Sequence, residues 1–275
     1  MDFSVNGDYM NIKLRQADSK DIPALKKLWQ ICFNDRMKYI NIFFEKMFIA
    51  NNTVVAEYNN RVVGVVYILD RELRGKRFLY GYGIGVLPEF RGNDICETML
   101  NAIKEYSKKE NLTFGLHPAN EKLAKFYQKI GLNEMYSLKE VNASGFISNE
   151  KYELLDITLD EFYNLRCSAF KNSVEWGKKA LKYILENGEA VKKIALQDKN
   201  YYFVLNKSGN TVIVKETNAN EDVIIRVTQS IKDYFNAKNI TFFLSNDSTL
   251  QGEIKPVIYG FSEKDTEVYM NLFLD

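Results

Sequence analysis

A short turn in the first half of the sequence has residues that can hold a phosphate group. Arg91 and Gly92 come directly before a stretch in which apolar side chains recur at helical spacing. The first N–H groups of a helix have no partner inside that helix, and they suit an anion. The Arg91 guanidinium can add charge-assisted hydrogen bonds at the same place. The sequence therefore predicts an anion site formed by Arg91, Gly92, Asn93, Asp94, Ile95 and Cys96.

A glycine-rich strand leads into this turn. Residues 80–86 are mostly β-branched or aromatic, interrupted by Gly81, Gly83 and Gly85. Successive side chains of a strand point to opposite faces, so we expect all three glycines on one face. A face without side chains lets a ligand approach the backbone closely. Pro88 is expected to end the strand.

Two segments in this order resemble motifs of the GNAT superfamily of N-acyltransferases. Residues 86–100 are similar to the loop that holds the acyl-CoA pyrophosphate in that family. The second segment is a helix with the family's spacing of an Asn, an Ala and a Tyr, carried here by Asn120, Ala124, Phe126, Tyr127 and Gly131. The resemblance covers roughly residues 10–143.

The pyrophosphate loop departs from the family pattern at two positions. The family has glycine three and five positions after its Arg or Gln, where this sequence has Asp94 and Cys96. We expect Asp94 to cap the helix, although its charge opposes a phosphate. The departure predicts weaker binding of acetyl-CoA and leaves the expected fold unchanged.

The resemblance implies an α/β (α+β) fold with a mixed, mostly antiparallel sheet flanked by helices. It implies direct transfer of an acetyl group from acetyl-CoA to a primary amine of a small molecule or peptide, without a metal. In the family a splayed strand holds the pantetheine arm, and Ile84, Gly85 and Val86 are the matching residues. Asn120 would bind the same arm or order the site, and Tyr127 would be the general acid that protonates the departing thiolate.

Several roles stay open. Tyr127 has an alternative role as an aromatic residue packed on the sheet. Glu45, Glu57 and Asp70 are candidates for the general base, and each can equally be a surface charge. Asp275 is a further candidate, because residues 267–274 alternate like a strand and the carboxy terminus reaches the first site in some tandem GNAT proteins.

Composition excludes several classes of function. Lys plus Arg is 37 and Asp plus Glu is 36, so no strong attraction to nucleic acid or membrane follows. The single histidine, His117, rules out multi-histidine metal sites and is expected to be structural. Three widely spaced cysteines and an N-terminus unlike a signal peptide favour a cytoplasmic protein. Oligomeric state is left open.

The chain is expected to form two domains, residues 1–143 and 156–275, joined by a polar linker at 144–155. The first should contain a strand at 11–17, two helices, a hairpin turning at Asn59-Asn60, the glycine-rich strand, and two helix–strand units.

The second half repeats that order. Two helices, three strands, a helix and a strand are predicted between residues 159 and 244. The loop at residues 217–220 lacks an Arg-Gly pair, so we interpret this half as a smaller GNAT-like domain without its own acyl-CoA site.

Asp94 and Cys96 favour an alternative function, a binding or regulatory module that keeps the fold without turnover. A dinucleotide site is rejected, because its glycines belong in the turn that opens the helix, whereas Gly81, Gly83 and Gly85 lie within a strand.

Overall fold

The computed structural model describes residues 6–7, 12–171, 173–186, 190–262, 270 and 272 of the 275-residue chain. They divide into two compact units. Unit 1 holds the chain up to residue 135 and residues 258–262, and unit 2 holds residues 136–257 with 270 and 272. The predicted domain limits at 143 and 156 both lie inside unit 2, because the strand that ends at Asn142 pairs with a later strand of that unit.

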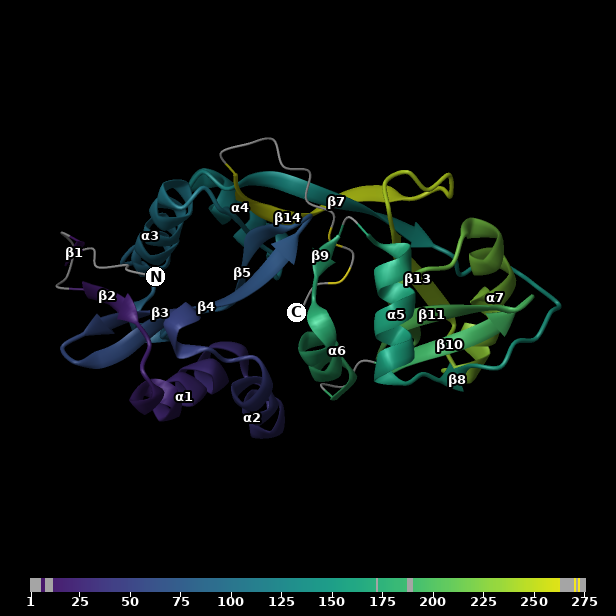
Figure 1. The fold of residues 1–275 in the computed structure, drawn as a ribbon, viewed down its shortest axis with the longest axis horizontal. Coiled ribbons are helices and arrows are strands. Elements are labelled where there is room, and N and C mark those ends of the chain that lie inside the picture. Colours follow the sequence, from purple (N-terminus) through teal and green to yellow (C-terminus); the bar gives the residue numbers. More distant parts are fainter. Residues whose placement is uncertain are drawn as a thin grey trace. The chain divides into compact units, whose positions relative to one another are not determined.

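Unit 1 is a sheet with helices on both faces (Figure 1). Its helices are α1 (Ile22–Phe33), α2 (Met37–Lys46), α3 (Ile95–Lys109) and α4 (Glu121–Lys129), with 3-10 turns at Ser19–Asp21, Ala50–Asn52 and Pro88–Phe90. Its strands are β1 (Asn6–Gly7), β2 (Ile12–Gln16), β3 (Thr53–Tyr58), β4 (Arg61–Leu73), β5 (Lys76–Val86), β6 (Thr113–Leu116) and the last residues of β14 (Glu253–Phe261).

The sheet of unit 1 is mixed and mostly antiparallel, as predicted. Its strand order is β1-β2-β3-β4-β5-β6-β14, and only β5 and β6 run parallel among the pairs with a described register. Helices α1 and α2 lie on one side of the sheet and α3 and α4 on the other (Figure 1). Gly64 of β4 lets α3 pack closely, since a Cβ there would lie 3.1 Å from the Met99 side chain.

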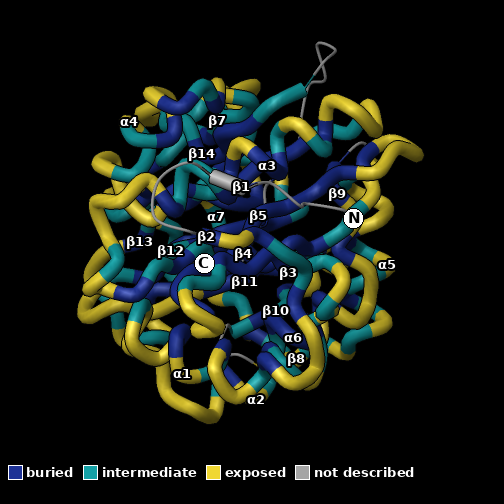
Figure 2. The backbone as a smooth tube through the Cα atoms, turned by 90° about the vertical axis from the view of Figure 1, so that its left-hand side faces the viewer, coloured by how far each residue is buried: buried dark blue, intermediate teal, exposed yellow. Residues whose placement is uncertain are grey.

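Local sequence accounts for these elements. Asp18 forms a capping box with Asp21 ahead of α1, and Leu25, Leu28 and Trp29 form its buried stripe. Figure 2 shows the buried residues concentrated along the strands and the exposed residues on the outer sides of the helices.

The hairpin turns follow the residues that tolerate positive φ. Asn59 and Asn60 have φ angles of 48° and 61° and close the β3–β4 hairpin, as predicted. The charged stretch at 71–76 is mostly strand. β4 continues to Leu73, only Arg74-Gly75 turns, and burial lowers the pKa of Arg71 to about 10.

Unit 2 repeats the order of elements found in unit 1. Its helices are α5 (Leu159–Ala169), α6 (Gly177–Glu186) and α7 (Glu221–Tyr234). Its strands are β7 (Asn133–Asn142), β8 (Leu155–Asp156), β9 (Val174–Glu175), β10 (Ala190–Leu196), β11 (Lys199–Ser208), β12 (Thr211–Thr217) and β13 (Asn239–Leu244). The predicted helices and strands of the second half are thus confirmed, within one or two residues at most ends.

The sheet of unit 2 has its own parallel pair. Its order is β7-β13-β12-β11-β10-β8, with β12 and β13 parallel, as β5 and β6 are in unit 1. β12 carries a bulge at Lys215, between the pairs Val204↔Glu216 and Leu205↔Val214. Helix α7 begins after Asn220, whose side chain accepts a hydrogen bond from the Val223 amide at 3.0 Å.

A buried ion pair lies at the bulge of unit 2. Arg166 donates to both oxygens of the Glu216 carboxylate, at 2.9 and 3.2 Å, and the Tyr202 hydroxyl donates to the same carboxylate at 2.7 Å. Arg166 also donates to the Val174 carbonyl oxygen at 3.3 Å. Charged groups survive burial when they are paired and hydrogen-bonded in this way.

No helix among the described residues is long and apolar enough to cross a membrane.

Candidate active site

The glycine-rich strand β5 contains a β-bulge. Val65 pairs with Gly85 and Tyr67 pairs with Tyr82, so β5 has one residue more than β4 between these pairs. Gly83, inside the bulge, has a φ of +56°, which glycine adopts without steric cost. The extra residue breaks the ladder and turns the rest of the strand.

The bulge overturns the prediction that the three glycines share one face. A Cβ on Gly85 would lie 3.2 Å from the Cys32 sulfur and from the Leu28 side chain, so Gly85 faces α1. A Cβ on Gly81 would meet the ring of Phe114, on the other side of the sheet. Alternation predicts faces correctly only while the ladder is regular.

The predicted anion loop follows β5 directly. The backbone of Gly92 has a φ of 81° and that of Asp94 a φ of 54°, and both residues are exposed. In the described part of the chain, the amide N–H groups of residues 92–97 donate to no protein acceptor. Consecutive free amides at the start of a helix form a concave, positively polarised surface that fits a diphosphate.

Asp94 differs from its prediction in one respect. It occupies the N-cap position of α3, but its side chain accepts no capping hydrogen bond. Its left-handed backbone is one that Asp tolerates better than most residues and that glycine adopts freely. Asp94 therefore has a backbone conformation that glycine adopts freely, and it adds a negative charge to the loop.

Arg91 connects the loop to the strand. Its Nε donates to the Val86 carbonyl oxygen at 3.0 Å, and the Cys32 thiol donates to the same oxygen at 3.4 Å. Burial raises the pKa of the Cys32 thiol, and the Arg91 guanidinium opposes that rise. The structure thus brings Arg91 and Val86 of the predicted site into direct contact.

Tyr127 lies beside the first turn of α3. Burial raises the pKa of Tyr127, and the neighbouring Cys96 thiol raises it further. Burial likewise raises the pKa of Cys96 to about 12. Tyr127 is 5% exposed. A phenol that stays protonated is thus held close to the anion-binding end of α3.

Both ends of α4 are fixed, and this positions Tyr127. The Asn120 side chain accepts from the Leu123 amide at 3.0 Å, which caps the N-terminus. At the other end Gly131 has a φ of 80°, and the Leu132 amide donates to the Tyr127 carbonyl at 3.0 Å. Asn120 is therefore a helix cap here, with its oxygen already bonded.

The candidate bases all have basic partners. Glu45 pairs with Lys46 at 3.3 Å, Glu57 with Arg15 at 2.8 Å, and Asp70 with Arg77 at 2.6 Å. Asp275 and most of residues 267–274 lie outside the described residues. His117 directly follows β6, at the strand end where it was expected.

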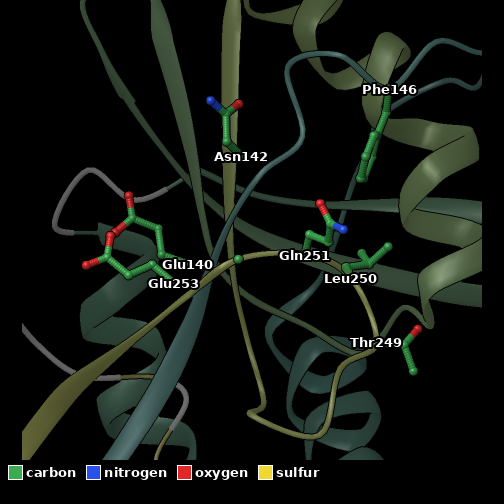
Figure 3. A pocket seen from close by; sticks show the side chains of 8 residues that line it. Glu140, Asn142, Phe146, Thr249, Leu250, Gln251 and Glu253 are labelled. Atoms are coloured by element: carbon green, nitrogen blue, oxygen red, sulfur yellow. The ribbon is translucent and has the colours of Figure 1, made fainter.

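A separate pocket in unit 2 has a different chemistry. Residues of β7 and of the segment before β14 line it, and Figure 3 shows Glu140 and Glu253 meeting at one side. Lys255 forms ion pairs with both carboxylates. None of the predicted acyl-CoA residues lines this pocket, and its carboxylates do not favour a phosphate. The described residues contain no cluster of metal-ligating side chains.

Comparison with known proteins gives the family of unit 1. The model of the acetyltransferase (GNAT) family matches residues 19–132. These residues include the bulged strand, the amide-lined loop and Tyr127. The chain therefore carries a GNAT acetyltransferase domain, and it is an enzyme of the acyltransferase class.

Solved structures extend the likeness in fold to most of the chain. A GCN5-related N-acetyltransferase from Anabaena variabilis has 16% identity and a TM-score of 0.67, over 90% of this chain and 72% of that one. One from Kribbella flavida has 15% identity and a TM-score of 0.62, over 90% and 68%. A protein of unknown function from Enterococcus faecalis has 9% identity and a TM-score of 0.69, over 91% and 72%. No curated protein matches the sequence.

Proposed function

We propose that the protein transfers an acetyl group from acetyl-CoA to a primary amine of a small molecule or peptide. The observation that carries this proposal is the position of Tyr127 beside Cys96. Cys96 lies in the first turn of α3, whose free amides suit a diphosphate. Unit 1 thus offers both a phosphate-binding element and a protonated group. A thioester donor with a diphosphate tail uses both, at the two ends of its pantetheine arm.

The residues fit acetyl-CoA as a substrate. The amides of residues 92–97 and the exposed Arg91 would hold the diphosphate. The bulge at Gly83 opens the ladder beside Ile84, Gly85 and Val86, where the pantetheine arm would bind the backbone.

In the proposed reaction the amine nitrogen attacks the thioester carbonyl carbon, and the carbon–sulfur bond then breaks. The thiolate takes the proton of Tyr127, and the nitrogen that attacked gives up a proton to the Tyr127 phenolate, which restores the phenol. Because burial raises its pKa, Tyr127 keeps this proton until negative charge develops on the sulfur. Backbone N–H groups at the bulge would support the carbonyl oxygen.

A screen of amines tests this proposal. Release of free thiol from acetyl-CoA would be followed with small primary amines and with peptides that have free N-termini. Amine-dependent thiol release by the wild type and none by Tyr127→Phe would support the proposal.

The alternative is a non-catalytic module that binds acyl-CoA, and Asp94 at the glycine place favours it. Titration calorimetry separates the two. Tight binding of acetyl-CoA without turnover of any amine would favour the module. Absence of binding would contradict both.

A further inference from the structure

The hydroxyl group of Tyr67 is buried without a hydrogen-bond partner. Tyr67 is 1% exposed, and its hydroxyl oxygen is one of two buried side-chain polar atoms for which no partner is found among the described residues. Buried hydroxyl groups are nearly always hydrogen-bonded, so an exception beside a functional site calls for an explanation. A ligand that is not bound in this structure would supply the missing partner.

Tyr67 lies on β4 at the bulge of β5. It is the residue of β4 that pairs with Tyr82, where the ladder resumes after the bulge. A Cβ on Gly83 would lie 2.9 Å from the Tyr67 ring, so the ring packs against the bulged backbone. The rings of Trp29 and Phe43, at centroid distances of 5.2 and 5.1 Å, hold it from the side of α1 and α2.

Cys32 lies beside the same part of β5 as Tyr67. Burial raises the pKa of Tyr67, and the Cys32 thiol adds to this rise. Cys32 in turn lies against Gly85 and donates to the Val86 carbonyl oxygen at 3.4 Å. Tyr67, against Gly83, and Cys32, against Gly85, thus flank the bulged end of β5 where the pantetheine arm would lie.

We propose that the Tyr67 hydroxyl donates a hydrogen bond to the acyl carbonyl oxygen of the bound thioester. This inference rests on the proposed function and adds a catalytic residue to it. As the amine attacks, the carbonyl oxygen gains negative charge and the hydrogen bond strengthens. Tyr67 keeps its proton throughout, so no bond to it forms or breaks. A fixed donor in an apolar environment stabilises such a charge effectively.

A comparison of two ligands tests this role. Acetyl-CoA has the acyl carbonyl and CoA lacks it, so Tyr67→Phe should weaken binding of acetyl-CoA by about 2–10-fold and leave CoA unchanged. With an amine acceptor, kcat should fall by about 10²–10³-fold. The midpoint of thermal unfolding should stay the same or rise, because the lost hydroxyl had no partner.

Tyr202→Phe is the matched control. It removes the same group from β11, the strand of unit 2 that matches β4 in the order of elements, where the hydroxyl donates to Glu216 at 2.7 Å. It should lower the unfolding midpoint and leave both ligand affinities unchanged.

The infrared spectrum of bound acetyl-CoA labelled with ¹³C at the acyl carbonyl gives a second readout. The carbonyl stretching frequency should be lower on the wild type than on Tyr67→Phe, because only the wild type has the hydroxyl donor. Equal frequencies on the two proteins, or equal loss of affinity for CoA and acetyl-CoA in Tyr67→Phe, would overturn the inference. A wild type that binds neither ligand would instead contradict the proposed function, and this inference with it.

Discussion

The Nε of Arg91 donates a hydrogen bond of 3.0 Å to the carbonyl oxygen of Val86. This bond joins the loop that would hold the diphosphate to the strand that would hold the pantetheine arm. Two parts of one elongated ligand site are thereby kept in register before the ligand binds. Because the side chain is exposed, its guanidinium is also accessible to an incoming phosphate.

Arg91→Ala should weaken acetyl-CoA binding by roughly 10–100-fold, since a hydrogen bond to a charged group contributes about 1.5–3 kcal/mol. Titration calorimetry would measure the change. Arg36→Ala is the control, because it removes an equally exposed charge ahead of α2. Equal affinities of the two variants would show that Arg91 does not contact the ligand.

Tyr127→Phe should lower kcat by about 10²–10⁴-fold, the usual contribution of a positioned proton donor. The affinity for acetyl-CoA should stay within about twofold of the wild type, because the ring that packs between α3 and α4 is retained. Steady-state kinetics and calorimetry on the same preparation would measure both. Unchanged kcat would assign the proton to another group.

The pKa of Tyr127 also predicts how stability depends on pH. Its pKa is raised in the folded state, so its contribution is fully present below the unfolded value of about 10 and is lost as pH rises above it. Above pH 10 the wild type should lose about 1.4 kcal/mol per pH unit relative to Tyr127→Phe. Denaturant unfolding of both proteins between pH 7 and 11 would measure this difference, and parallel curves would contradict it.

Two substitutions at Asp94 separate its charge from its backbone. Asp94→Asn removes the charge and keeps a residue that tolerates positive φ. Asp94→Gly removes the charge and also the steric cost of placing a side chain on a left-handed backbone. Both should strengthen acetyl-CoA binding by about 2–10-fold, because a charge near the phosphates is lost. Improvement in Asp94→Gly alone would attribute the effect to the backbone.

The helix caps of the two units provide a matched pair. Asn120 caps α4 and Asn220 caps α7, each through a hydrogen bond of 3.0 Å. Replacing either by Ala should cost about 1 kcal/mol of unfolding free energy. Only Asn120→Ala should also lower kcat, because α4 carries Tyr127. Equal loss of kcat in both variants would show that the effect comes from stability alone.

Local patterns in the sequence were sufficient to predict most elements. The apolar stripe of α1, the Asn59-Asn60 hairpin and the cap at Gly131 depend on residues close to one another in the chain. The same holds for the loop after β5, where Arg91 and Gly92 precede the free amides. These features are set by local geometry, so a single sequence contains the necessary information.

Features that depend on a partner strand could not be predicted in this way. The bulge that separates Gly81 from Gly85 exists only because β4 supplies one residue fewer than β5 between two pairs. The orphaned hydroxyl of Tyr67 depends on the same register and on rings from α1 and α2. In the sequence, Tyr67 is one more aromatic residue in an apolar strand.

The two bulges leave their polar groups in opposite conditions. At the bulge of unit 2, Glu216 receives hydrogen bonds from Arg166 and Tyr202, so both of its carboxylate oxygens are bonded within the protein. At the bulge of unit 1, the Tyr67 hydroxyl is buried by the surrounding side chains and has no hydrogen-bond partner among the described residues. The same order of elements can thus serve two roles. In unit 2 the polar groups at the bulge bond one another and make the unit rigid. In unit 1 the hydroxyl at the bulge has no partner within the described part of the protein and can take part in chemistry.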